Sequence, residues 1–308
     1  MKDIILNNGI KMPQVGLGTF LIPSQELSRT IGEAYELGYR QFDTAWRYYN
    51  ECDIAKALKE HGINREDVFI TTKINADALY PFSYQYGKKR VLNVIRYPKS
   101  IYRAILESFN NLQTDYIDLF LVHWPWPIYT KLYKALTKLY KEGRIRAIGV
   151  SNCSPAHIEY LREFSDIVPA LNQVEISPLN SQGKLVNWCQ QNGIAVEAMS
   201  TFSHFRSVEP RKEILEDPTL LKIAHVKNKS VVQIVLRWLI QRDIIVIPKT
   251  WNLKHLQENI DIFDFQLSDE EMGIIDSLDT GKCYNYDCWG DQAAMSLPKN
   301  LRAKRFDF

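Results

Sequence analysis

The sequence predicts an α/β protein in which eight parallel strands, each followed by a helix, close into a barrel. Short apolar segments alternate with longer amphipathic ones, a pattern typical of parallel strands joined by helical crossovers. Eight strand segments can be counted, and 308 residues suffice for one barrel of eight such units, which needs about 250. No linker rich in Gly, Ser or Pro divides the chain. We therefore expect one (β/α)₈ TIM barrel domain over residues 1–308.

A β-hairpin is expected before the barrel, because apolar residues 4–6 and 10–12 flank Asn8-Gly9, a dipeptide that favours a two-residue turn. The expected barrel strands are residues 15–18, 39–43, 68–72, 116–122, 145–150, 170–174, 195–199 and 244–247. The expected helices include residues 25–37, 54–61, 101–112, 129–142, 155–164, 183–192 and 231–241. Gly62, Gly143 and Gly193 follow three of these helices and tolerate the left-handed backbone that ends a helix.

Two segments do not fit a minimal barrel. Residues 75–99 form a long loop after the third strand, and residues 281–308 form an irregular C-terminal loop. A loop as long as the first is usually functional. The basic run Lys88-Lys89-Arg90 within it is interpreted as a solvated turn.

Composition and motif spacing exclude several classes of function. Lys and Arg total 38 against 36 Asp and Glu, so neither a nucleic-acid nor a membrane surface is expected. The most apolar stretch, residues 231–247, is interrupted by polar and charged residues, and no signal peptide or membrane span is expected. Five scattered cysteines favour reduced thiols and a cytoplasmic protein. No metal-ligand spacing is present, so no metal is expected.

Polar residues follow the expected strands, at the barrel end where active sites of this architecture form. Asp43 ends the second strand and Tyr48 follows it, Lys73 follows the third and His123 the fourth. A phenol has a pKa of about 10, and a nearby ammonium lowers it. We expect Asp43 to hold Lys73 in a buried ion pair and Lys73 to make Tyr48 more acidic. His123 is expected to donate a hydrogen bond to an oxygen that gains negative charge.

This set suits protonation of a carbonyl oxygen during hydride delivery to the carbonyl carbon. Each residue taken singly also has a structural interpretation: Asp43 as the cap of a turn, for example, or His123 as a satisfied core histidine. The convergence of four such residues on one rim favours the catalytic interpretation.

Several runs of residues resemble the aldo-keto reductases over nearly the whole chain. The matching runs are residues 7–9 with 12–13, 15–20, 42–45 with Tyr48, Asn50 and Glu51, 71–73, 118–125, 148–152, 172–175 and 247–250. The resemblance implies a barrel enzyme that reduces an aldehyde or ketone with a nicotinamide cofactor. It implies Tyr48 as the general acid, Asp43 and Lys73 as the residues that tune it, and His123 as the residue that orients the carbonyl.

The resemblance also implies an extended cofactor lying across the rim. Ser151, Asn152 and Gln173 fall where the family binds the nicotinamide carboxamide, Lys249 and Thr250 where it binds the adenosine phosphates, and Glu258 and Asn259 where it binds adenine. The complete expected set is Gly18, Thr19, Phe20, Asp43, Ser151, Asn152, Gln173, Met199, Ser200, Thr201, Phe202, Lys249, Thr250, Trp251, His255, Glu258 and Asn259. NADPH is the expected cofactor, with NADH left open.

Three features depart from the family pattern. Met199 stands where the family usually stacks a tyrosine on the nicotinamide, although a thioether also packs on rings. His255 stands where an arginine usually binds the 2′-phosphate, which weakens the expected preference for NADP because a neutral histidine binds phosphate less firmly. The stretch from Lys73 to His123 is longer than usual, and we expect residues 75–99 to overhang the substrate pocket.

The substrate pocket is expected to be aromatic, lined by Phe20, Trp46, Tyr49, Trp124 and Trp289. Such a lining favours an apolar or aromatic aldehyde or ketone as the small-molecule partner. Packing of Trp289 onto the barrel is the alternative to its role in the pocket. We expect a monomer. The alternative function is a nucleotide-binding regulatory subunit of low turnover, a role that some relatives of the family have.

Overall fold

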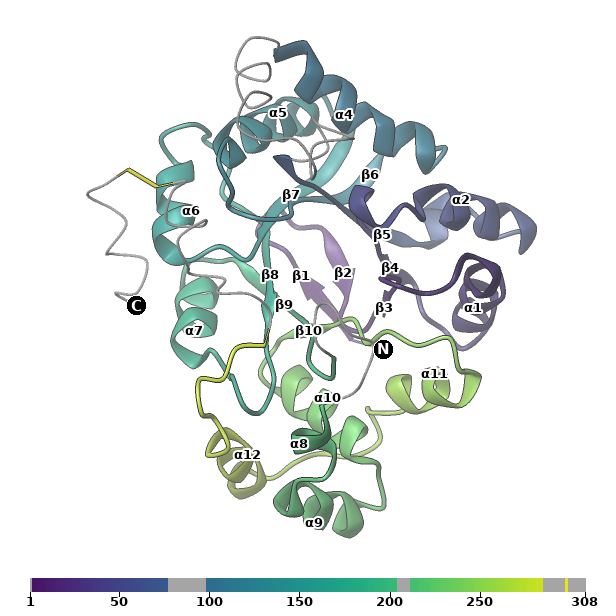
Figure 1. The fold of residues 1–308 in the computed structure, drawn as a ribbon, viewed down its shortest axis with the longest axis vertical. Coiled ribbons are helices and arrows are strands. Elements are labelled where there is room, and N and C mark those ends of the chain that lie inside the picture. Colours follow the sequence, from purple (N-terminus) through teal and green to yellow (C-terminus); the bar gives the residue numbers. More distant parts are fainter. Residues whose placement is uncertain (1, 77–97, 204–210, 285–296, 299–308) are drawn as a thin grey trace.

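The computed structural model describes residues 2–76, 98–203, 211–284 and 297–298. A ring of parallel strands lies at the centre and helices surround it (Figure 1). The fold class expected from the sequence is therefore confirmed. The strands are β1 (Asp3–Ile5), β2 (Lys11–Pro13), β3 (Leu17–Gly18), β4 (Gln41–Asp43), β5 (Phe69–Ile74), β6 (Ile117–Val122), β7 (Ile145–Ser151), β8 (Leu171–Glu175), β9 (Ala195–Met199) and β10 (Ile245–Val246).

The helices cover the outer face of the ring. They are α1 (Ser24–Glu36), α2 (Glu51–Glu60), α4 (Pro98–Asn111), α5 (Tyr129–Lys141), α6 (Pro155–Leu161), α7 (Gly183–Gln191), α8 (Lys212–Leu215), α9 (Pro218–Lys227), α10 (Val231–Gln241), α11 (Leu253–Ile260) and α12 (Asp269–Asp276), with 3₁₀ turns η1 (Trp46–Tyr48) and η2 (Arg65–Asp67). Four of them, α8, α9, α11 and α12, were not among the predicted helices. Two carried a usable signal, because Asp217 precedes Pro218 at the start of α9 and Ser268 forms a capping box with Glu271 in α12.

Strands β3 to β10 pair in chain order, each parallel to the next. The sheet closes between its first and last strands, where Gly16 N donates to Val246 O at 2.8 Å and Val246 N donates to Gln14 O at 2.9 Å. Every residue of β5 and β6 is buried. Strands covered on both faces read as nearly continuous apolar runs, which is why these strands were visible in the sequence.

The β1–β2 hairpin closes one end of the barrel. Its Leu6 and Met12 are buried in a cluster with Leu119, Leu171 and Ile245 from the inner face of the strands. The connection is a three-residue loop and not the two-residue turn expected, because Leu6 N bonds Ile10 O and Gly9 takes a φ of +84°. Glycine at that left-handed position produces a bulge that widens the turn by one residue. The opposite end of the barrel, where the carboxyl ends of the strands lie, is left open for a functional site.

An ion cluster around a buried carboxylate stabilises the barrel where β5 and β6 begin. The Asp118 carboxylate is fully buried and accepts from Arg65 at 2.7 Å, Arg146 at 2.6 Å and the backbone N–H of Ile70 at 3.0 Å. Asp118→Ala is expected to lower the free energy of unfolding by about 3 kcal/mol, because it removes the anion that holds both guanidinium groups. Urea unfolding followed by circular dichroism measures the loss. As the control, Asp166→Ala breaks an exposed pair with Lys141 and should change stability little; equal losses in the two variants would contradict the assignment.

Candidate active site

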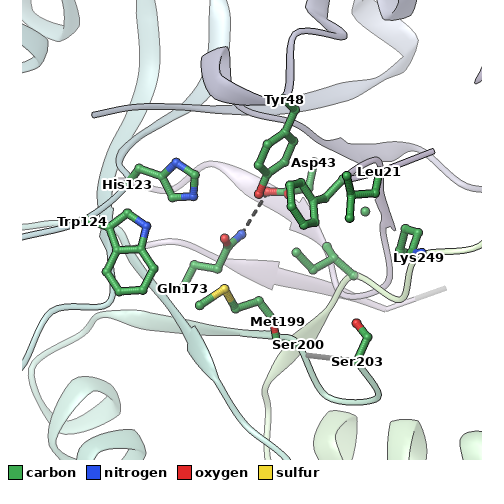
Figure 2. Close-up of a pocket in the computed structure, with 13 residues that line it drawn as sticks. Leu21, Asp43, Tyr48, His123, Trp124, Gln173, Met199, Ser200, Ser203 and Lys249 are labelled. Atoms are coloured by element: carbon green, nitrogen blue, oxygen red, sulfur yellow. Dashed lines mark hydrogen bonds between the residues drawn. The ribbon is translucent and has the colours of Figure 1, made fainter. Parts of the chain in front are cut away.

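The four candidate catalytic residues come from three neighbouring strands at the open end of the barrel. Asp43 ends β4 and Lys73 lies in β5, next to it in the sheet. His123 directly follows β6, and Tyr48 ends the 3₁₀ turn η1 that follows β4. The structure brings all four together, and Tyr48 and His123 both point into one pocket (Figure 2).

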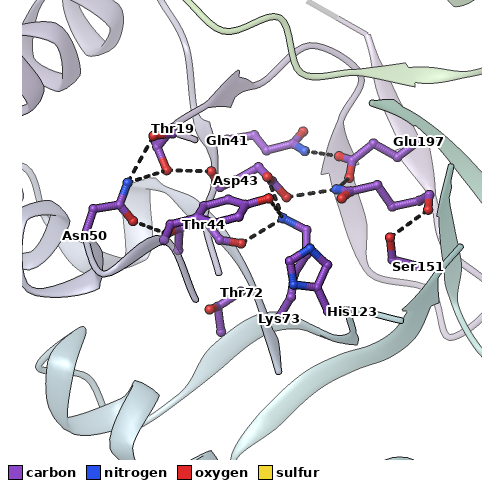
Figure 3. A network of polar contacts seen from close by, with 12 residues as sticks. Thr19, Gln41, Asp43, Thr44, Asn50, Thr72, Lys73, His123, Ser151 and Glu197 are labelled. Carbon is purple, nitrogen blue, oxygen red and sulfur yellow. Dashed lines mark hydrogen bonds and ion pairs between the residues drawn. The ribbon is translucent and has the colours of Figure 1, made fainter. Parts of the chain in front are cut away.

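Lys73 is fully buried and uses each of its three ammonium hydrogens. It donates to Asp43 Oδ1 at 2.6 Å, to Thr44 O at 2.8 Å and to Tyr48 Oη at 3.5 Å (Figure 3). Burial lowers the pKa of Lys73, but Asp43, Tyr48 and Glu197 together more than offset this, so the pKa lies above its ordinary value. Lys73 is therefore a cation at neutral pH.

The acidity of Tyr48 differs from the sequence-based expectation. Burial raises the pKa of Tyr48 above its ordinary value and outweighs the Lys73 ammonium, which lowers it. The expectation of an unusually acidic phenol is wrong in its net direction, because desolvation of the phenolate exceeds what a 3.5 Å contact with Lys73 returns. The phenol is consequently protonated at neutral pH, which is the state a general acid must start from.

His123 is a neutral imidazole at neutral pH. Burial holds its pKa well below the usual range, and the cations Lys73 and Arg47 add to the effect. The ring meets Tyr48 edge-on at a centroid distance of 5.9 Å. Its Nδ1 is buried and finds no hydrogen-bond partner among the residues described. A neutral imidazole carries one N–H, so His123 can donate a single hydrogen bond to an oxygen in the pocket.

The pocket above these residues is a cavity of about 90 Å³. Its apolar wall is formed by Phe20, Leu21, Trp124 and Met199 (Figure 2). Phe20 packs on Tyr48 with ring centroids 4.7 Å apart, and Trp124 stacks on Trp126 at 5.8 Å. An apolar wall beside a phenol and an imidazole suits a small carbonyl compound better than a charged one.

Two of the expected pocket residues do not line the cavity, and a third lies outside the described residues. Trp46 is not among the lining residues and donates its indole N–H to Glu107 at 3.2 Å. Tyr49 is 78% exposed and packs on Trp46. Trp289 and most of residues 75–99 lie outside the described residues. Leu21, Ser203 and Ile247 line the cavity without having been predicted, and short apolar or hydroxyl residues in loops carry no distinctive sequence signal.

A second, larger cavity of about 600 Å³ adjoins the first and shares Ser200, Ser203, Ile247 and Lys249 with it. Together they form one continuous groove along the rim. Of the residues expected to bind the cofactor, the larger cavity is lined by Ser200, Thr201, Phe202, Lys249, Thr250, Trp251, His255, Glu258 and Asn259. Gly18, Phe20, Asp43, Gln173 and Met199 line the smaller one.

Three expected cofactor residues lie behind the groove. Thr19 is fully buried and donates to Asp43 O at 2.8 Å. Ser151 and Asn152 are also fully buried, and Asn152 donates to Ser151 Oγ at 3.0 Å and to His123 O at 3.2 Å. The Asn152 Oδ1 atom has no partner in the described part of the chain. An orphaned buried acceptor fits an amide N–H donor such as the carboxamide of a nicotinamide.

Lys249 is the cation of the larger cavity. Burial lowers its pKa, and its ammonium lies 4.9 Å from the centre of the Trp251 ring. His255, on α11, lines the same cavity, and Asn252 caps that helix by accepting from His255 N at 3.3 Å. One lysine and one histidine thus face the region expected to bind adenosine phosphates.

Within the described residues, no group of three or more His, Cys, Asp or Glu side chains is arranged to hold a metal ion. No helix of the described segments is long and apolar enough to cross a membrane.

Comparisons with known proteins identify the family of this chain. The sequence model of the aldo/keto reductase family matches residues 14–280. The chain is 39% identical over 287 residues to morphine 6-dehydrogenase of Pseudomonas putida, covering 90% of this chain and 91% of that protein. It is 39% identical over 282 residues to glyoxal reductase of Bacillus subtilis, covering 90% and 93%. It is 36% identical over 282 residues to methylglyoxal reductase of Escherichia coli O157:H7, covering 91% and 94%.

Solved structures of aldo-keto reductases are also similar to this chain. An aldo-keto reductase of Bombyx mori in complex with NADP has a TM-score of 0.79 at 33% identity, covering 92% of this chain and 94% of that one. An aldo-keto reductase from a Medee basin deep-sea metagenome library also has a TM-score of 0.79, at 37% identity and with 91% and 96% covered. The relatives named here carry the names of enzymes, so the alternative of a regulatory subunit gains no support.

Proposed function

Because the chain belongs to the aldo/keto reductase family of oxidoreductases, which act on carbonyl substrates, we propose that it is an NADPH-dependent carbonyl reductase with Tyr48 as its general acid. One observation carries the proposal. A protonated phenol and a neutral imidazole face one small cavity, and that cavity adjoins a larger one of about 600 Å³ that shares four lining residues with it.

The residues of the groove fit such a cofactor. Asn152 Oδ1 and the Gln173 amide would hold its carboxamide, Met199 would pack on its ring, and Lys249 would meet its phosphates. When bound, the reduced nicotinamide supplies a hydride to the carbonyl carbon.

Side chains of the protein bind and protonate the carbonyl oxygen of the substrate. His123 donates a hydrogen bond to the carbonyl oxygen and orients it toward Tyr48. Tyr48 transfers its phenolic proton to that oxygen as negative charge develops there, which completes the alcohol. The Lys73 ammonium then stabilises the phenolate left behind, and Asp43 keeps Lys73 charged.

The proposal is tested by following NADPH oxidation with a panel of small and aromatic aldehydes and ketones. Two relatives are named for the reduction of glyoxal and methylglyoxal, so both compounds belong in the panel. We expect oxidation that depends on the carbonyl and on the enzyme concentration. Failure of every carbonyl to oxidise NADPH would overturn the proposal.

The preference for NADPH is expected to depend on Lys249. Lys249→Met should raise the Kd of NADPH by about tenfold, the scale of one lost hydrogen bond to a charged group, and should affect NADH less because NADH lacks the 2′-phosphate. Titrations of both cofactors, read by quenching of tryptophan fluorescence, measure the difference. Lys254→Met is the control, since Lys254 is exposed on α11 and lies outside the cavity lining. Equal losses for both cofactors would contradict a role specific to the 2′-phosphate.

A further inference from the structure

Glu197 is a buried carboxyl group that the proposed reaction does not use. It lies in β9, is fully buried, and points into the barrel beneath the pocket. Its Oε1 accepts from Gln41 Nε2 at 2.7 Å, and its Oε2 accepts from Gln173 Nε2 (Figure 3). Residues on β4, β8 and β9 are thereby joined across the inside of the barrel.

The contact with Glu197 completes the bonding of the Gln173 amide nitrogen. Gln173 Nε2 also donates to Asp43 Oδ2 at 2.9 Å, so its two hydrogens serve two carboxyl groups. The amide therefore keeps one orientation, with its nitrogen toward Asp43 and Glu197. Without Glu197, a half-turn of the amide would lose only one bond, and it would place an oxygen against the Asp43 carboxylate.

The residues around Glu197 leave room for its contact with Gln41. A Cβ added at Gly16 would lie 2.7 Å from the side-chain carbons Cγ and Cδ of Gln41, so glycine leaves the room that Gln41 needs to reach Glu197. The interior of such barrels is normally filled by branched apolar side chains. A buried carboxyl held by two amides is a costly substitute for them, which points to a functional role.

We propose that Glu197 is a positioning residue for carbonyl reduction: together with Gln41 it locks the Gln173 amide, and through that amide it fixes Asp43 and the Lys73–Tyr48 pair. The inference rests on the proposed function and adds a second layer beneath its four catalytic residues. The complete chain runs Gln41, Glu197, Gln173, Asp43, Lys73 and Tyr48.

This series of hydrogen-bonded residues also predicts a pH effect. Burial and the nearby Asp43 raise the pKa of Glu197 to about 8, while the Gln173 amide, the Lys73 ammonium and the Gln41 amide oppose them. Ionisation of Glu197 raises the pKa of both Tyr48 and Lys73. A phenol with a higher pKa gives up its proton less readily, so kcat of the wild type should fall as the pH rises through about 8.

Two variants of Glu197 separate positioning from packing. Glu197→Gln keeps the shape and imitates the protonated acid; Gln41 Oε1, a buried acceptor that has no hydrogen-bond partner among the described residues, can receive its new N–H. Its kcat at neutral pH should stay close to wild type and the step near pH 8 should vanish. Glu197→Ala releases Gln173, and we expect about tenfold lower kcat and weaker NADPH binding, the scale of one lost buried hydrogen bond.

The experiment measures kcat, KM for the carbonyl and the Kd of NADPH against pH for the wild type and both variants, with circular dichroism as the check of folding. Glu51→Gln is the matched control, because Glu51 is buried, accepts from Thr72 at 2.6 Å and Asn111 at 3.0 Å, and has a pKa raised by burial. In Glu51→Gln, kcat should still fall as the pH rises through about 8, which we call the alkaline step.

The outcomes are distinguishable. A wild-type protein that reduces no carbonyl would overturn the proposed function. An active wild type whose alkaline step persists in Glu197→Gln, or whose kcat is matched by a folded Glu197→Ala, would overturn the role of Glu197 alone.

Discussion

Tyr48→Phe is expected to lower kcat for carbonyl reduction by roughly 10²- to 10⁴-fold, the contribution of a positioned general acid. The substitution removes one oxygen and keeps the ring that packs on Phe20. NADPH binding should therefore stay close to wild type, as measured by fluorescence titration. Steady-state oxidation of NADPH with the best carbonyl substrate gives kcat.

The neighbouring Tyr49 offers a matched control for that experiment. It has the same hydroxyl, but it is 78% exposed and does not line the cavity. Tyr49→Phe should leave kcat unchanged. If Tyr48→Phe also reduced the carbonyl substrate with the kcat of the wild type, another group would have to donate the proton and the assignment of Tyr48 would fail.

Lys73→Met carries the second large effect, on both stability and activity. It leaves the Asp43 carboxylate buried without its cation, which typically costs about 3–5 kcal/mol of unfolding free energy. It also removes the charge that stabilises the phenolate of Tyr48, so kcat should fall even where the protein stays folded. Urea unfolding and steady-state turnover measure the two effects separately.

A double variant distinguishes them. Asp43→Asn combined with Lys73→Met removes both charges and should recover much of the lost stability, because no unpaired ion remains in the barrel. It should stay inactive, since the phenolate still lacks its cation. Recovery of activity together with stability would mean that Lys73 acts only through the fold.

The features that could be predicted from the sequence were those with a local pattern. Strand β9 and helix α10 were predicted with their observed limits, and the structure adds a Ser230 cap at the start of α10. The candidate catalytic residues could be proposed because each lies at or shortly after the carboxyl end of an expected strand, and the carboxyl ends of parallel strands meet at one rim.

Local geometry after β4 explains the two aromatic residues that were misplaced. Trp46, Arg47 and Tyr48 form a 3₁₀ turn, in which residues three apart share a face. The rings of Trp46 and Tyr49 therefore pack together in a tilted arrangement, with centroids 5.8 Å apart, on a different side from Tyr48, aided by a left-handed backbone at Tyr49 with φ of 56°. The sequence shows the aromatic residues, but not which of them turns inward.

Other features depend on distant residues or on a balance of opposing effects. Gln41 and Glu197 are 156 residues apart, and neither has a neighbour in the sequence that announces their contact. The direction of the Tyr48 pKa depends on how far burial outweighs a cation at 3.5 Å, which requires coordinates.

The most direct test of the central claim combines a labelled cofactor with the wild type and Tyr48→Phe. NADPH carrying deuterium at the transferred position should yield an alcohol labelled at the former carbonyl carbon, and single-turnover formation of that alcohol should be slowed at least about 10²-fold in Tyr48→Phe. Alcohol without deuterium, or labelled alcohol formed equally fast by Tyr48→Phe, would contradict hydride transfer assisted by this phenol.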